Sequence, residues 1–132
     1  MERFPVTRPV SLIALAAAAA VAAAAPALAH HGWAWAETQQ SSLAGVVQSV
    51  SMTPPHPSLQ IKARDGAVWR VDLGNPGLTA RSGFVEGSAK AGDSITVLGN
   101  RALDRNQRLM KAVRLTVGGK TYDIYPDRIR PS

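Results

Sequence analysis

Apolar and polar residues alternate along several short segments of the chain, and this period of two predicts β-strands. The clearest example is the pair of segments 58–63 and 68–73, in which every second residue is apolar. Asp65-Gly66 lies between them and is typical of a type I′ turn, which needs positive φ at both central residues. The two segments therefore predict an antiparallel hairpin.

Further alternating or β-branched segments follow along the rest of the chain, and glycine- and proline-rich stretches separate them. We predict strands over 43–52, 58–63, 68–73, 94–99, 109–117 and 121–124, and one short helix over 78–84. In the fifth of these strands, alternation groups Lys111 on one face with Leu109, Val113, Leu115 and Val117.

This order of elements predicts an all-β fold with one short helix. Three strands, a helix and then the remaining strands fit a small antiparallel OB-like β-barrel, in which a helix lies between strands three and four. An open β-sandwich of the same strands is the alternative.

The first 29 residues do not fit the strand pattern and predict a secretory signal peptide. Two arginines precede an apolar run over 10–25, and Ala27-Leu28-Ala29 has small residues at the A-x-A spacing of a cleavage site. The run is shorter than the roughly 20 residues that span a bilayer, so an uncleaved membrane anchor is the weaker alternative. We expect cleavage after Ala29 and a periplasmic protein with no transmembrane anchor after cleavage.

The predicted organisation then has four parts. Residues 1–29 are the signal peptide, 30–42 a polar and aromatic N-terminal arm, 43–125 the OB-like domain and 126–132 a polar tail. In an extended arm, Trp33 and Trp35 would share one face.

Composition removes several classes of chemistry. The chain has no cysteine, which excludes thiolate metal sites, disulfides and cysteine nucleophiles. Its formal net charge is +6, but the basic residues are scattered, and we expect no nucleic-acid partner for an exported protein. No paired carboxylates stand out for acid–base work, and no serine lies in a G-x-S-x-G elbow.

The three histidines carry the candidate chemistry. Cleavage after Ala29 makes His30 the first residue, so its α-amine and Nδ1 can chelate one metal ion. A third nitrogen from His31 or His56 would complete the T-shaped set called a histidine brace, which favours Cu(II). Prolines on both sides hold the backbone of His56. If these side chains do not converge, the same residues are ordinary surface histidines.

Several segments together resemble a family of small exported bacterial proteins whose function is unknown. The shared pattern is a leader ending Ala-His-His before an aromatic, a Gly-x-Val strand, an Asn-Pro-His-type turn, a Trp-x-Val-x-Leu-Gly strand and Lys-x-Gly-Asp. The corresponding segments here are Ala29-His30-His31-Gly32-Trp33, Gly45-Val46-Val47, Pro54-Pro55-His56-Pro57, Trp69-Arg70-Val71-Asp72-Leu73-Gly74 and Lys90-Ala91-Gly92-Asp93. Pro55 departs from the usual Asn, and Gly32-Trp33 from the usual Ser-Phe. The resemblance implies export, a barrel-like fold and the joint occurrence of the His-His start and the turn histidine. It implies no activity.

These observations give three functional interpretations. The first is a non-enzymatic periplasmic binding protein that holds copper through His30, His31 and His56. The second is a metal-free module of the cell envelope that binds a ligand or a protein, using the face near Trp69 and the basic surface. A copper-dependent oxidase is the third and least favoured, because it needs open coordination positions on a bound metal. The sequence leaves the oligomeric state open.

Overall fold

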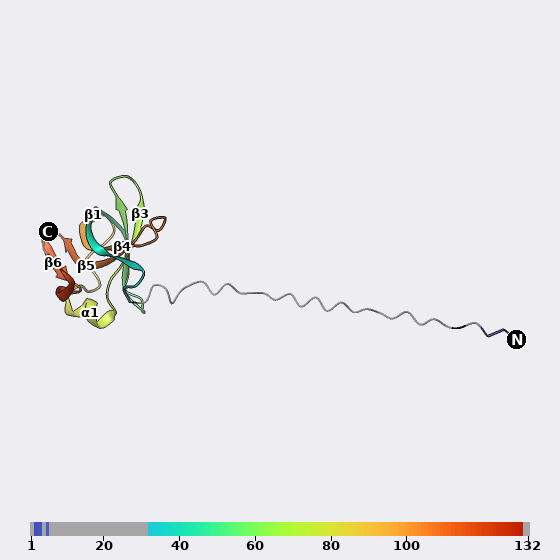
Figure 1. The fold of residues 1–132 in the computed structure, drawn as a ribbon. Helices are drawn as coiled ribbons and strands as arrows, with labels where there is room; N and C mark the ends of the chain where they lie inside the picture. Colours follow the sequence, from blue (N-terminus) through green and yellow to red (C-terminus); the bar gives the residue numbers. More distant parts are fainter. Residues whose placement is uncertain (1, 4, 6–31, 131–132) are drawn as a thin grey trace.

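The computed structural model describes residues 2, 3, 5 and 32–130, and the folded domain lies within 32–130 (Figure 1). His30 and His31 therefore lie outside the described residues. The strands are β1 (Ala36–Ser51), β2 (Ser58–Ala63), β3 (Val68–Asp72), β4 (Ser94–Ala102), β5 (Leu109–Val117) and β6 (Lys120–Asp123). The helix α1 (Pro76–Arg81) follows β3, and a 3₁₀ turn, η2 (Pro126–Arg128), follows β6.

The six strands form one sheet in the order β3-β2-β1-β4-β5-β6. All neighbours in this order are antiparallel, and a parallel pairing of β3 with β5 joins the two sides of the sheet. The pairings of β1 to β5 thus run in a closed circuit, which we call the strand ring. The predicted fold class, mostly antiparallel β with one short helix, is confirmed.

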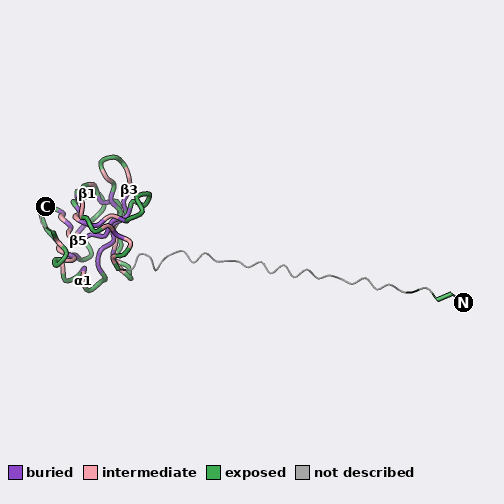
Figure 2. Tube along the Cα trace, in the orientation of Figure 1, coloured by how far each residue is buried: buried purple, intermediate pink, exposed green. Residues whose placement is uncertain are grey.

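The core fills the inside of the strand ring. Figure 2 shows buried stretches along the strands and exposed stretches in the connecting loops. Fully buried side chains come from every part of the ring and from the segment after α1; the largest are Phe84, Leu59, Ile61, Leu73, Met110, Leu115 and Ile124. Since the chain has no cysteine, burial of this apolar surface is the main stabilising contribution.

The strand β1 begins seven residues earlier than expected, at Ala36 rather than Leu43. Its first half is polar and partly exposed, so no alternation marks it as a strand. It pairs with an extension of β4, which continues to Ala102 instead of ending at Gly99. The segment that the sequence predicts as an arm therefore contributes its second half to the sheet.

One face prediction in β5 is wrong. The pairing of β5 with β4 shifts by one residue at Val113, which is a β-bulge. Core contacts before the bulge come from Met110 and Ala112, whereas the core positions after it are Leu115 and Val117. Because side chains alternate along a strand, Lys111 lies on the face opposite Met110 and Ala112.

Smaller differences concern turns and ends. The hairpin turn between β2 and β3 is not type I′, because only Gly66 has positive φ, at 85°. Its amide donates to the Ala63 carbonyl at 3.0 Å, and the Asp65 carboxylate accepts from the Ala67 amide at 2.9 Å. The helix begins at Pro76 and ends at Arg81, two residues before the expected start and three before the expected end. The 3₁₀ turn η2 lies within the predicted polar tail.

No helix in the described part of the chain is both long enough and apolar enough to cross a membrane.

Candidate functional site

His56 lies in the turn that joins β1 to β2. Its side chain is half-buried, and the preceding Pro54–Pro55 peptide bond is cis. Pro57 is buried, and its carbonyl accepts a hydrogen bond from the Leu73 amide at 2.9 Å. The turn that carries His56 is thus attached to the end of β3.

The start of the domain packs on its last elements through Trp33. The rings of Trp33 and Tyr125 meet edge to face, with centroids 4.9 Å apart. The Arg128 guanidinium lies 4.1 Å from the centroid of Trp33, within the range of a cation–π contact. The chain turns immediately afterwards, since the Ala36 amide donates to the Trp33 carbonyl at 3.0 Å. Trp33 and Trp35 therefore do not form the extended pair that the sequence suggests.

A buried lysine lies beneath this contact. Lys111 is only 4% exposed, and its Nζ donates to the Gly32 carbonyl at 3.2 Å. The same Nζ lies 5.0 Å from the Trp33 centroid and 5.7 Å from that of Tyr125. Lys111 therefore fixes the backbone two residues after His30.

Burial sets the electrostatics of this cluster. It lowers the pKa of Lys111 below the ordinary 10.5; Asp72 raises that pKa and Arg128 lowers it, both by smaller amounts. Burial also raises the pKa of Tyr125 above 10.0, against a smaller opposite effect of Arg128. Both shifts favour the neutral form, as expected for groups removed from water.

The strand register brings the His56 turn and the start of the domain to the same end of the sheet. Ser58 lies opposite Asp72 in the β2–β3 pair, and Asp72 lies opposite Lys111 in the β3–β5 pair. Two strand spacings, about 10 Å, therefore separate the backbones of Ser58 and Lys111. His56 is two residues before Ser58, and Lys111 contacts Gly32.

Of the three predicted ligands, His56 is the one that the structure describes. Within residues 2, 3, 5 and 32–130 there is no group of three or more His, Asp or Glu side chains that would hold a metal ion. The buried Asp72 is already paired with Arg70, whose Nε lies 2.8 Å from its Oδ1. The other two predicted ligands, His30 and His31, lie outside the described residues.

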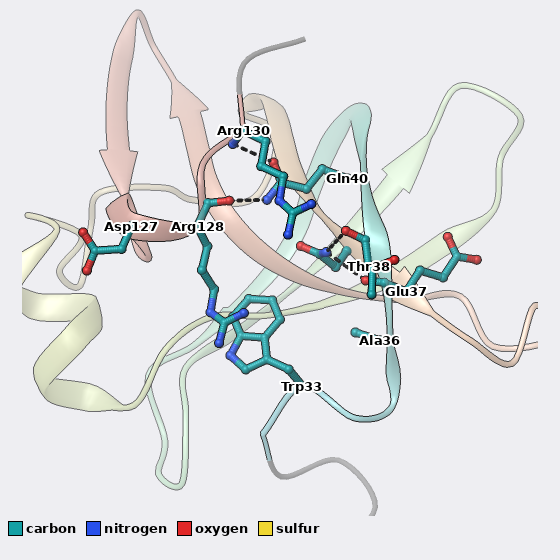
Figure 3. A pocket seen from close by; sticks show the side chains of 9 residues that line it. Trp33, Ala36, Glu37, Thr38, Gln40, Asp127, Arg128 and Arg130 are labelled. Carbon is teal, nitrogen blue, oxygen red and sulfur yellow. Dashed lines mark hydrogen bonds between the residues drawn. The ribbon is translucent and has the colours of Figure 1, made fainter.

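A polar groove of about 530 Å³ adjoins the Trp33 contact (Figure 3). It lies between the first half of β1 and the segment around η2. The lining residues are Trp33, Ala36, Glu37, Thr38, Gln40, Asn100, Asp127, Arg128 and Arg130. We call it the Trp33 groove.

Sequence reasoning missed Lys111, Tyr125 and Arg128. A lysine inside an apolar alternating strand was the available signal for Lys111, but alternation alone put it on the wrong face. Trp69, considered as part of a binding face, is 5% exposed and belongs to the core cluster. Arg101 covers its ring at 4.6 Å from the centroid, so Trp69 packs in the core and beneath a side chain.

The fold and the contacts of Trp33 together define a class: a small, mostly antiparallel β protein in which the start of the described domain packs on its last elements. The chain belongs to a family of unknown function (DUF6152), whose model matches residues 15–110. All three histidines and Trp33 fall within the match, whereas Lys111, Tyr125 and Arg128 follow it. No curated protein matches the chain.

Proposed function

We propose that this protein is an exported, non-enzymatic binding protein of the periplasm that holds copper at its mature N-terminus. Cleavage after Ala29 frees the amine of His30, which chelates the metal together with its own Nδ1. A third nitrogen comes from His56, or from His31 in its place. In the uncut precursor the His30 nitrogen is an amide, and this chelate does not exist.

The observation that supports the proposal is the register that links Ser58, Asp72 and Lys111. It puts the His56 turn at the end of the sheet where Lys111 holds the Gly32 carbonyl. An N-terminal residue two positions before an anchored backbone samples a small volume, which lowers the entropy lost on binding. Nitrogen ligands in a tetragonal arrangement favour Cu(II) over the other common divalent ions.

The proposal is tested with exported protein whose first residue is confirmed as His30 by mass spectrometry. Cu(II) affinity is measured by calorimetric titration for this protein and for a form in which an acetyl group caps the α-amine of His30. The acetylated nitrogen is an amide, so the chelate loses one donor. We expect the acetylated form to bind Cu(II) at least about tenfold more weakly, a difference of about 1.4 kcal/mol.

Two variants identify the third ligand. His56→Ala weakens binding if the turn histidine coordinates the metal, and His31→Ala does so if the second residue coordinates it. Electron paramagnetic resonance of the Cu(II) form gives the number of coupled nitrogens in each case. Equal affinity of the free and the acetylated forms would contradict the proposal.

A further inference from the structure

The Trp33 groove contains a buried hydrogen-bond acceptor with no donor. Asn100 is 6% exposed, and its Nδ2 donates to the carbonyls of Glu37, at 2.8 Å, and Thr38, at 3.4 Å. These two bonds fix the orientation of the amide, because exchanging its atoms would bring Oδ1 against two carbonyl oxygens. Oδ1 is left buried without a hydrogen-bond partner among the described residues.

Such an acceptor is costly unless a donor reaches it, since a buried polar atom loses its water without compensation. Oδ1 itself has almost no exposed surface, but Asn100 lines the groove, so a small movement of this wall would let a molecule in the groove supply the missing donor. A hydroxyl or amino group on that molecule would satisfy Oδ1.

The groove also has a fixed cationic wall. Stacking on Trp33 holds the guanidinium of Arg128, and Gln40 fixes the backbone on either side of Ile129. In these contacts Gln40 Nε2 donates to the Arg128 carbonyl and Gln40 Oε1 accepts from the Arg130 amide. A guanidinium stacked on a ring keeps its N–H groups directed outward in the plane, where they can bind a carboxylate.

The acidic groups of the lining do not cancel this charge. The Glu37 carboxylate is paired with Arg105, at 2.6 Å between Oε1 and Nε. In Figure 3 the Asp127 carboxylate points away from Gln40, Thr38 and Trp33, whereas Arg128 and Arg130 reach into the space between them. The middle of the groove is therefore basic, with an unsatisfied acceptor on one wall.

We propose that the Trp33 groove binds a small organic anion that carries a hydroxyl or amino group close to a carboxylate. Arg128 binds the carboxylate, Arg130 supplies further positive charge, and Asn100 Oδ1 accepts a hydrogen bond from the neighbouring donor. The volume suits a small polar metabolite, and these residues are separate from the three histidines of the copper proposal.

The test compares malate with succinate, which differ by one hydroxyl group. Metal-free protein is prepared with a chelator, so the result does not depend on copper. Each anion is titrated while the side-chain amide of Asn100 and the indole N–H of Trp33 are followed by NMR. We expect saturable shifts of both signals and about tenfold tighter binding of malate, the ratio expected for one additional satisfied hydrogen bond.

Two variants test the contributions of Arg128 and Asn100 separately. Arg128→Gln weakens both anions about tenfold, and Asn100→Ala removes the preference for malate. Arg81→Gln, an exposed arginine at the end of α1, is the matched control and leaves both affinities unchanged. Absence of saturable shifts in the unmodified protein overturns the proposal, and so does equal binding of malate and succinate.

Discussion

At the scale of single residues, the charge of Lys111 is the feature with the clearest thermodynamic consequence. Burial lowers its pKa below 10.5, so the unfolded chain holds this proton more tightly than the folded protein does. The free energy of unfolding therefore rises with pH between the lowered pKa and 10.5. Below the lowered pKa, Lys111 is charged in both states, and the burial of its charge lowers the free energy of unfolding by the full amount.

We predict that Lys111→Met removes this rise. Urea unfolding between about pH 8 and pH 10 should give a flatter dependence on pH than the unmodified protein. Lys62→Met, an exposed lysine on β2, is the control and should keep the rise. The raised pKa of Tyr125 acts in the opposite direction only above pH 10, outside this range. An unchanged slope in Lys111→Met contradicts the prediction.

A second residue-scale prediction concerns Gly45, where β1 and β2 approach closely. A Cβ at this position would overlap the Lys62 carbonyl oxygen and lie 2.8 Å from Cγ2 of Ile61. We expect Gly45→Ala to lower the free energy of unfolding by about 1–3 kcal/mol, measured by chemical denaturation.

Gly77→Ala is the matched control for this change. A Cβ there meets only Asn75 Oδ1, at 3.5 Å, and the position lies in α1. Alanine favours the helix by up to about 1 kcal/mol, so this variant should be neutral or more stable. A loss of stability equal to that of Gly45→Ala would show that the close approach in β1 is not the cause.

The candidate site was predictable only where single residues carry a distinctive chemistry. His56 and the histidines after Ala29 stand out because the chain has no others. Lys111 could not be assigned, because its face depends on the bulge at Val113 and bulges leave no mark in the alternation. The unsatisfied oxygen of Asn100 depends on two backbone carbonyls of β1 and is likewise invisible in the sequence.

At the scale of elements, alternation succeeded where one face of a strand is buried and the other exposed. Strand β2 has the predicted bounds for this reason; β5 also has them, although it is buried along most of its length. The first half of β1 failed the same criterion, because its polar side chains are partly exposed and its partner, the end of β4, is distant in sequence. The first half of β1 is a strand because its backbone is hydrogen-bonded to β4, and such bonds do not depend on the type of side chain.

The helix α1 gives a prediction at this scale. Asn75 caps it: its Oδ1 accepts from the Leu78 amide at 2.9 Å, and Pro76 follows at the first position. We expect Asn75→Ala to lower the free energy of unfolding by about 1 kcal/mol, measured by thermal or urea denaturation. Asn75→Asp keeps an oxygen acceptor and should retain most of the stability; an equal loss in both variants would mean that the cap does not act through this bond.

At the scale of the whole molecule, Trp33 binds the start of the folded domain to its last elements. It contacts Tyr125, Arg128 and Lys111, which come from the segment after β6, the turn η2 and β5. We expect water to reach Lys111 when this ring is removed, because Trp33 lies over the Lys111 ammonium, with Nζ 5.0 Å from the ring centroid.

We therefore predict that Trp33→Ala raises the pKa of Lys111 towards its ordinary value. NMR titration of the Lys111 side chain measures this shift directly. The free energy of unfolding should also fall, by about 1–3 kcal/mol, since an aromatic pair and its buried area are lost. Leu103→Ala, a 60% exposed residue, is the surface control and should change neither quantity. An unmoved pKa would mean that other groups keep water from Lys111.

The contact between Trp33 and Arg128 has a practical consequence for protein engineering. Because the two ends of the domain meet there, anything fused after residue 130 begins next to the segment that follows His30. A polyhistidine affinity tag at the C-terminus would bring a dense set of imidazoles close to the copper site that we propose at the N-terminus. A tag at the N-terminus would block the α-amine. Self-cleaving fusions that leave His30 first and nothing after Ser132 avoid both effects.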